Sequence, residues 1–187
     1  VVYGPANIAP DIRNTINQYT TSINDQTGQS SGGAQIAATS KTDFIEQLSV
    51  IRDIRTEAQS FLTQRLDLEK ILLTKIQALA ACLKNKEGLA NAAAEAKVAA
   101  QQKIVNDASK QVGDNLAVIN NLNNVINQIS QLTEAQFAGL GSTLSISAVA
   151  EAISFRTNAK NQRDTALANV PAQVTNADND LVACNAL

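Results

Sequence analysis

The positions at which glycine and proline are missing constrain this chain more than any other feature. Neither residue occurs from 34 to 87 or from 89 to 112, and Gly113 is the single exception before Gly139. Glycine and proline interrupt helices most strongly, so stretches of this length without them are typical of long helices. The sequence therefore predicts long helical arms, with turns near Gly88 and Gly139.

The first arm, residues 40–87, carries an apolar face. Its hydrophobic residues recur three or four positions apart, with one interruption near Arg65. This is the spacing of one side of an α-helix. Ser40 and Asp43 match a loose capping box at the start, and Gly88 suits the left-handed residue that ends a helix. The apolar positions are Phe44, Leu48, Ile51, Ile54, Ala58, Phe61, Leu68, Leu72, Ile76, Leu79 and Leu83.

The second arm, from about Leu89 to Phe137, has two different halves. The first half is rich in alanine, which favours a helix and lets a neighbouring backbone approach closely. The second half repeats aliphatic residues every seven positions, close to a coiled-coil seam. Asn115 falls on this seam, so either its amide fixes the register between helices or Leu116 fills the core beside it. The repeating residues are Val105, Val112, Ile119 and Ile126, with Ala108, Leu122 and Ile129 between them.

The third arm follows Gly141, and any of several Ser and Thr residues could cap its start. Pro171 lacks a backbone donor and clashes with the preceding turn, so this arm is either kinked there or divided near Asn169, and we favour a kink. Residues 1–39 are less regular. A short amphipathic helix is expected at or after Pro10, followed by a loop rich in Gly, Ser and Gln.

The arms are nearly equal in length, which gives a geometric prediction. If successive arms are antiparallel, Cys82 and Cys184 lie at the same end of the bundle. A disulfide bond between them is then favoured over two buried thiols. Such a bond would indicate an oxidising compartment, and we expect a secreted protein. A removed signal peptide would explain a first residue other than Met, although a trimmed chain would explain it equally well.

The predicted fold class is all-α: an elongated antiparallel bundle of three long helices with a short N-terminal helix and one disulfide. We expect a single domain over residues 1–187, with 1–39 forming the N-terminal helix and loop and 40–187 forming the three arms. No run of apolar residues is long enough to span a membrane, so we do not expect a transmembrane protein.

Composition argues against most catalytic chemistry. The chain has no His, no Trp and no Met, only two Cys, and 3% aromatic residues. It therefore lacks the commonest proton shuttle and metal ligand. A formal net charge of −2 also speaks against nucleic acid as a partner. We expect no enzyme, no catalytic residue, no metal site and no cofactor.

Four local patterns could argue for chemistry or binding, and each has a plainer interpretation. Asp67 and Glu69 beside Lys70 are interpreted as a solvated face rather than as catalytic carboxylates. Cys82 near Lys84 is the best cysteine nucleophile available, but pairing with the other cysteine is the more economical reading. Asp178 and Asp180 form an Asp-x-Asp pattern that is too common to indicate a metal by itself. The Gly-rich loop after Thr27 has no P-loop lysine and is only a loop.

Two functional hypotheses remain. The first is a non-enzymatic extracellular structural or interaction protein that acts through helix faces, either by self-association or with a macromolecular partner. The sevenfold repeat and the amide-rich face from Asn115 to Gln131 favour it. The alternative is a carrier of a lipid or other apolar small molecule, in which the alanines and a kink at Pro171 leave a cavity between helices. The sequence names no ligand-binding residues for either hypothesis.

Overall fold

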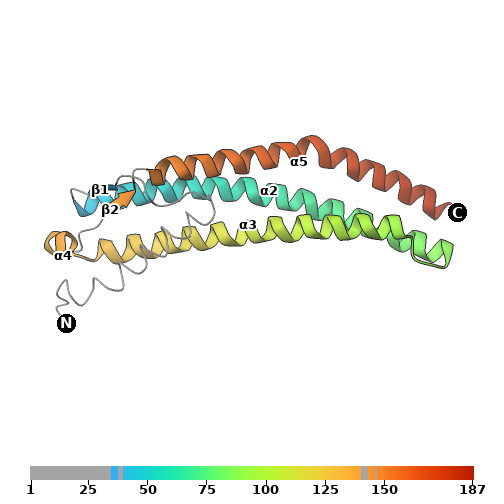
Figure 1. The fold of residues 1–187 in the computed structure, drawn as a ribbon, viewed down its shortest axis with the longest axis horizontal. Coiled ribbons are helices and arrows are strands. Elements are labelled where there is room, and N and C mark those ends of the chain that lie inside the picture. Colours follow the sequence, from blue (N-terminus) through green and yellow to red (C-terminus); the bar gives the residue numbers. More distant parts are fainter. Residues whose placement is uncertain (1–34, 38–39, 140–142, 146) are drawn as a thin grey trace. The chain divides into compact units, whose positions relative to one another are not determined.

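The computed structural model describes residues 35–37, 40–139, 143–145 and 147–187. Three long helices dominate it, and they pack together (Figure 1). The predicted all-α fold is confirmed, with one pair of very short strands added. The expected N-terminal helix and the Gly/Ser loop lie outside the described residues. The elements are β1 (Gln35–Ala37), α2 (Lys41–Glu87), α3 (Ala92–Ser130), α4 (Glu134–Gly139), β2 (Thr143–Ser145) and α5 (Ser147–Asn185).

Helix α2 has the ends that the sequence predicts. The backbone N–H of Asp43 donates to Ser40 Oγ at 3.0 Å, which satisfies one of the unpaired donors of the first turn. At the other end, Gly88 has a φ of 76° and its N–H donates to the Lys84 carbonyl at 3.0 Å. This is the left-handed glycine cap, which other residues adopt only with strain.

The second arm is shorter than the predicted range of Leu89 to Phe137. Helix α3 begins only at Ala92, because Asn91 caps it by accepting a hydrogen bond from the Ala94 N–H at 3.1 Å. It ends at Ser130, where the Leu132 N–H donates to a carbonyl three residues back at 3.0 Å. This tightened last turn is a common way for a helix to end.

Phe137 belongs to a separate short helix, α4, which sequence analysis merged with the second arm. Thr133 and Gln136 form a reciprocal capping box in front of it: the Gln136 N–H donates to Thr133 Oγ1 at 3.1 Å, and the Thr133 N–H donates to Gln136 Oε1 at 3.0 Å. The Thr-x-x-Gln pattern is present in the sequence and could have indicated this new start.

The strands β1 and β2 were not predicted. They pair antiparallel, with Gln35 opposite Ser145, Ile36 opposite Leu144 and Ala37 opposite Thr143. Their pairing links the segment that leads into α2 with the segment that leads into α5. Three residues per strand are too few to give a period-two pattern in the sequence.

Helix α5 continues through Pro171 without division. The proline removes one backbone donor, and the Thr175 hydroxyl donates to the Pro171 carbonyl at 3.1 Å. Figure 1 shows that α5 changes direction partway along its length, as expected of a proline-containing helix. The prediction of a kink rather than two helices agrees with this continuous element.

The chain forms two compact units. We call residues 1–58 and 114–158 unit 1, and residues 59–113 and 159–187 unit 2. Each of the three long helices contributes residues to both units, and the single domain expected for 1–187 stays a prediction. The units are described separately below.

Unit 1 has one hydrophobic core that draws on every helix in it. The rings of Phe44 on α2 and Phe137 on α4 lie 5.5 Å apart between centroids. Nearby, the Lys41 ammonium donates to the carbonyls of Ser130 and Leu132 at 3.3 and 2.9 Å, which caps the end of α3. The buried core residues are Phe44, Leu48, Ile51, Ile54, Val118, Leu122, Val125, Ile129, Leu132, Phe137 and Ala152.

A buried polar pair also lies in unit 1. Arg55 and Asn115 are both 0% exposed. The Arg55 guanidinium donates to Asn115 Oδ1 at 3.2 Å, and the Asn115 amide donates back to the Arg55 carbonyl at 3.0 Å. The guanidinium also lies 4.0 Å from the ring centroid of Phe155 on α5, a cation–π geometry.

This pair decides between the two readings of the α3 seam. Leu116 is 46% exposed, so it does not replace Asn115 in the core. Asn115 thus keeps its place on the sevenfold seam and is bonded to Arg55 of α2, while its role in fixing the register stays a prediction. Arg55 itself was not foreseen, although it stands between the core positions Ile51 and Ala58 at helical spacing.

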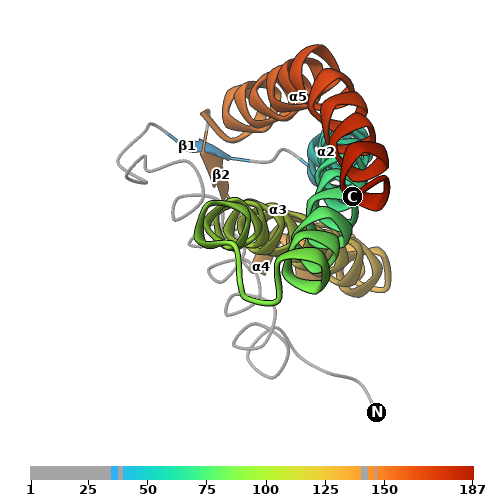
Figure 2. The same cartoon turned by 90° about the vertical axis from the view of Figure 1, so that its right-hand side faces the viewer.

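Two smaller core clusters lie among the described residues of unit 2. Leu66 and Leu73 of α2 pack with Val105 and Ala108 of α3. A different stripe of α2 packs on α5. Helix α2 therefore lies next to both neighbours, as Figure 2 shows from the end of unit 2. The second cluster consists of Leu72, Ala166 and Val170, with the partly buried Leu68, Ile76 and Val174 against it.

Candidate ligand-binding groove

A groove with a volume of about 350 Å³ lies in unit 2. All three long helices line it. Its α2 residues are among the most buried of the set, so α2 forms the floor while α3 and α5 form the walls. The lining residues are Leu72, Ile76 and Leu79 from α2, Ala94, Lys97, Ala100, Gln101 and Ile104 from α3, and Gln173, Asn176, Ala177 and Asp180 from α5.

The α3 wall follows from the alanine-rich sequence. Ala94 and Ala100 line the groove with single methyl groups, where a larger aliphatic side chain would reach α2 and fill the space. The two core clusters of unit 2 share no residue, and neither joins α3 to α5. Small side chains on one wall therefore leave the floor of the groove uncovered.

The α5 wall follows from the path of that helix. Arg163 donates to Gln64 at 3.0 Å across 99 residues of sequence. Further along the two helices, the disulfide bond from Cys82 to Cys184 spans 102 residues of sequence. Between the hydrogen bond and the disulfide, the α5 segment is therefore three residues longer than the α2 segment, which is nearly one helical turn. Pro171 lies in this longer stretch, and the groove begins just after it.

A buried polar network supports the floor. The Gln101 amide donates to Glu69 Oε2 at 2.6 Å and to the Glu69 carbonyl at 3.0 Å. Arg65 pairs with the same carboxylate at 3.6 Å. The interpretation of Glu69 as part of a solvated face is therefore wrong, because it is buried between α2 and α3, whereas Asp67 and Lys70 are exposed.

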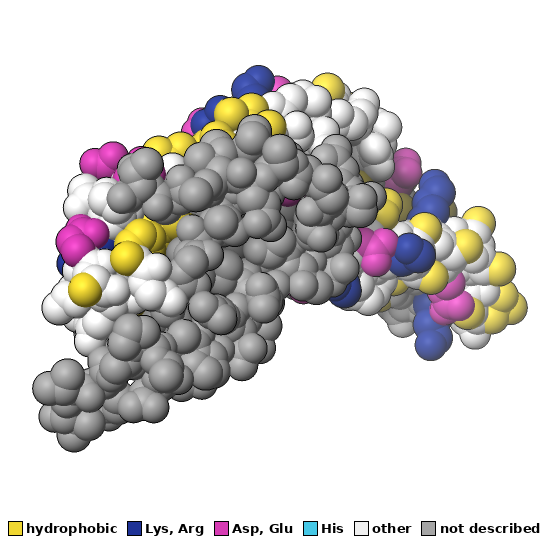
Figure 3. Space-filling model, turned by 60° about the vertical axis from the view of Figure 1, so that its left-hand side comes forward, with side chains coloured by type: hydrophobic (Ala, Val, Ile, Leu, Met, Phe, Trp, Pro, Cys, Tyr) yellow, Lys and Arg dark blue, Asp and Glu magenta, His cyan; other side chains and the backbone are white. Residues whose placement is uncertain are grey.

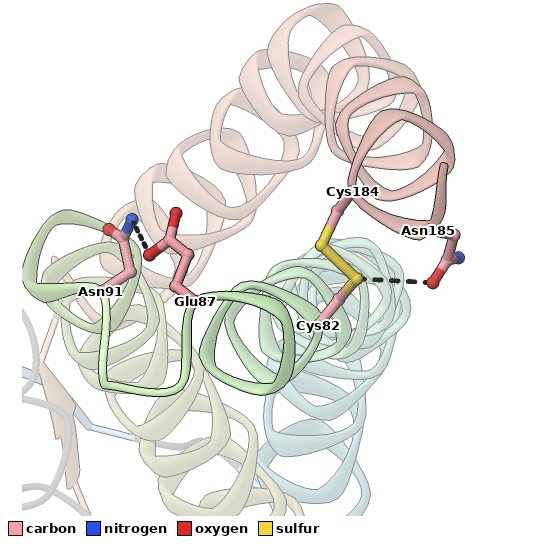
Figure 4. The surroundings of a disulfide bond; sticks show 5 residues. All are labelled: Cys82, Glu87, Asn91, Cys184 and Asn185. Atoms are coloured by element: carbon pink, nitrogen blue, oxygen red, sulfur yellow. Dashed lines mark hydrogen bonds between the residues drawn. A yellow bond between two sulfur atoms is a disulfide. The ribbon is translucent and has the colours of Figure 1, made fainter. Parts of the chain in front are cut away.

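The disulfide closes one end of unit 2. Cys82 and Cys184 form a disulfide bond, so the predicted pairing is present (Figure 4). Asn185 Oδ1 lies 3.4 Å from the Cys82 sulfur. A disulfide sulfur carries no hydrogen, so we read this as a contact and not as a hydrogen bond. Leu79 and Asp180, which line the groove, each stand about one turn before these cysteines.

The two aspartates near the C-terminus have separate roles. Asp178 pairs with Lys75 at 2.9 Å and joins α5 to α2. Asp180 lines the groove. Within the described parts of the chain, no three Asp, Glu or Cys side chains are grouped in a way that could hold a metal ion.

Apart from buried residues such as Arg55 and Glu69, many charged groups outside the groove are exposed, and they are mixed in sign. Figure 3 shows Lys and Arg side chains next to Asp and Glu on the face that it draws. A hydrogen bond to Asp107 raises the pKa of Lys103. Hydrogen bonds from Lys160 and Arg163 lower the pKa of Asp164. None of these groups lines the groove.

No protein-family model, curated protein or solved structure matches this chain. Among the described residues, none of the helices combines the length and the hydropathy that crossing a membrane requires.

Proposed function

We propose that this protein binds an apolar or amphiphilic small molecule in the groove of unit 2 and carries it. The observation behind the proposal is the apolar floor of a cavity of about 350 Å³. Ligand sites in proteins are concave, mostly apolar, and roughly 300 to 1,000 Å³ in volume. The protein acts without catalysis in this proposal.

The first hypothesis of the sequence analysis, a structural or interaction protein, stays a prediction. The sevenfold repeat of α3 and the amide-rich face favoured it. Residues Val105 and Ala108 of the repeat pack on α2 in unit 2, and Leu122 and Ile129 lie in the core of unit 1. Packing within the chain therefore accounts for the repeat. The groove, by contrast, is a concave site that nothing in the described residues fills.

The disulfide supports a place of action outside the reducing cytosol. Disulfide bonds persist mainly in secreted, periplasmic and extracellular proteins. We therefore propose that the carrier is secreted.

The test is binding of N-phenyl-1-naphthylamine, an uncharged apolar probe whose fluorescence rises in a dry site. We expect saturable binding to the full chain. Ala100→Phe places a ring in the groove and should weaken this binding at least tenfold. Ala99→Phe is the matched control, because Ala99 is the exposed neighbour that does not line the groove; it should change binding less than twofold.

Urea unfolding of both variants checks that each is folded. The proposal is wrong if the probe does not bind, or if the two substitutions weaken binding equally.

A further inference from the structure

The two charged side chains of the groove both lie on the disulfide side of Ile104. Helix α3 runs antiparallel to α2, since Glu69 contacts Gln101 while Gln59 contacts Val112. Helix α5 runs parallel to α2, as its links to that helix show. Lys97 on α3 and Asp180 on α5 therefore both lie nearer the disulfide than Ile104 does.

Lys97 and Asp180 also face the groove from opposite walls, because one belongs to α3 and the other to α5. Within the described residues, neither forms an ion pair or a side-chain hydrogen bond, and the same holds for Gln173 and Asn176. This differs from the neighbouring Asp178, which pairs with Lys75 at 2.9 Å. The polar atoms of these four side chains are thus available to a ligand, whereas the Gln101 amide is bonded to Glu69.

We infer that the ligand is a single-chain amphiphile with a zwitterionic head group. Its cationic part lies against Asp180 and its anionic part against Lys97, while its chain covers the apolar floor at Leu72 and Ile76. This inference rests on the proposed function and adds the class of ligand. It also explains why the groove carries one charge of each sign and no net charge.

Selectivity follows from repulsion as much as from attraction. An anionic head group would be attracted by Lys97 but repelled by Asp180, and a cationic head group would meet the reverse. An uncharged head group would leave both charges without a partner while displacing water from them. Only a head group with both charges satisfies the two walls together.

The test is displacement of N-phenyl-1-naphthylamine by four decyl amphiphiles below their micelle concentrations. They are decylphosphocholine, decyl sulfate, decyltrimethylammonium and decyl maltoside, which share a chain and differ in the head group. We expect the phosphocholine to displace the probe at a concentration at least tenfold lower than the other three. Far-UV circular dichroism checks that helix content is unchanged by each amphiphile.

Two single variants sharpen the test. Lys97→Gln leaves the aspartate and should move the preference to decyltrimethylammonium. Asp180→Asn leaves the lysine and should move it to decyl sulfate. Lys84→Gln and Glu95→Gln remove the same charges at exposed positions that do not line the groove, and should keep the phosphocholine preference.

The outcomes separate the two proposals. If the probe does not bind, the proposed function fails. If the probe binds but the four amphiphiles displace it equally, or the groove variants keep the original preference, only the zwitterionic inference fails.

Discussion

Units 1 and 2 contain segments of the same three helices, yet they pack in different ways. In unit 1, α3 supplies Val118, Leu122, Val125 and Ile129 to one core that all helices share. In unit 2, the α3 segment lines the groove with two alanines among its five residues, and one core cluster joins α2 to α3 while another joins α2 to α5. The bundle is closed where α3 carries large aliphatic residues and leaves a groove where α3 carries Ala94 and Ala100. The disulfide then secures the unit with the weaker core.

The largest expected effect comes from removing that bond. Cys82→Ser with Cys184→Ser opens a loop of 102 residues. In the chain-entropy model, closing a loop of this size contributes about 4 to 5 kcal/mol to stability. We expect a loss of this order in the free energy of urea unfolding, and reduction of the natural chain should have the same effect.

Hydrogen exchange of the variant without the disulfide tests which unit loses stability. Amides of α5 after Pro171 should lose protection before those of unit 1 around Leu122. An equal loss of amide protection in both regions would show that the two units unfold together. It would contradict the view that the core of unit 2 is the weaker one.

Matched truncations compare the cores directly. Leu122→Ala leaves a closed cavity in unit 1 and should cost about 3 to 4 kcal/mol. Leu72→Ala removes a side chain that already borders the groove, so less new void is created, and about 2 kcal/mol is expected. Chemical denaturation of both variants checks the order. A larger loss at Leu72 would contradict the view that unit 1 holds the tighter core.

The next largest loss of stability is expected from breaking the buried pair of Arg55 and Asn115. Asn115→Leu removes the hydrogen bonds that join it to Arg55, and should cost about 1 to 3 kcal/mol. Leu116→Ala, at the exposed neighbour, should change stability by less than about 0.5 kcal/mol. Equal effects at the two positions would mean that the amide has no part in setting the register.

The smallest effects concern two glycines and have opposite signs. Gly113→Ala should stabilise α3 by about 0.5 to 1 kcal/mol, because nothing lies within 4 Å of the added methyl group. Gly88→Ala should destabilise by about 1 kcal/mol, because its φ of 76° disfavours a side chain. Thermal unfolding of both variants tests the pair, and the same sign for both would contradict the assigned helix and cap.

Much of the fold could be predicted because local rules determine it. The absence of Gly and Pro indicated the helices, and Ser40 and Gly88 marked the ends of α2. The sequence analysis failed where a cap competes with an apolar pattern. Phe137 continues the helical spacing of the second arm, but Thr133 and Gln136 start a new helix in front of it.

The groove was foreseen in kind but not in detail. The alanines and Pro171 suggested a cavity between helices. Ala94 and Ala100 line one wall, and Pro171 lies just before the residues of the other. The side chains that face it depend on the register of α3 and α5 against α2, and a shift of three residues in α5 changes that set. Such a register depends on contacts between residues far apart in sequence, like that of Arg163 with Gln64, which no local pattern reveals.

The bond from Cys82 to Cys184 also makes a closed covalent ring of everything between them. One peptide bond cut anywhere inside this ring leaves the two pieces attached to each other. A protease that nicks the chain near α4 would thus yield a molecule that runs as one band on a gel, and that separates into fragments only when a thiol is added.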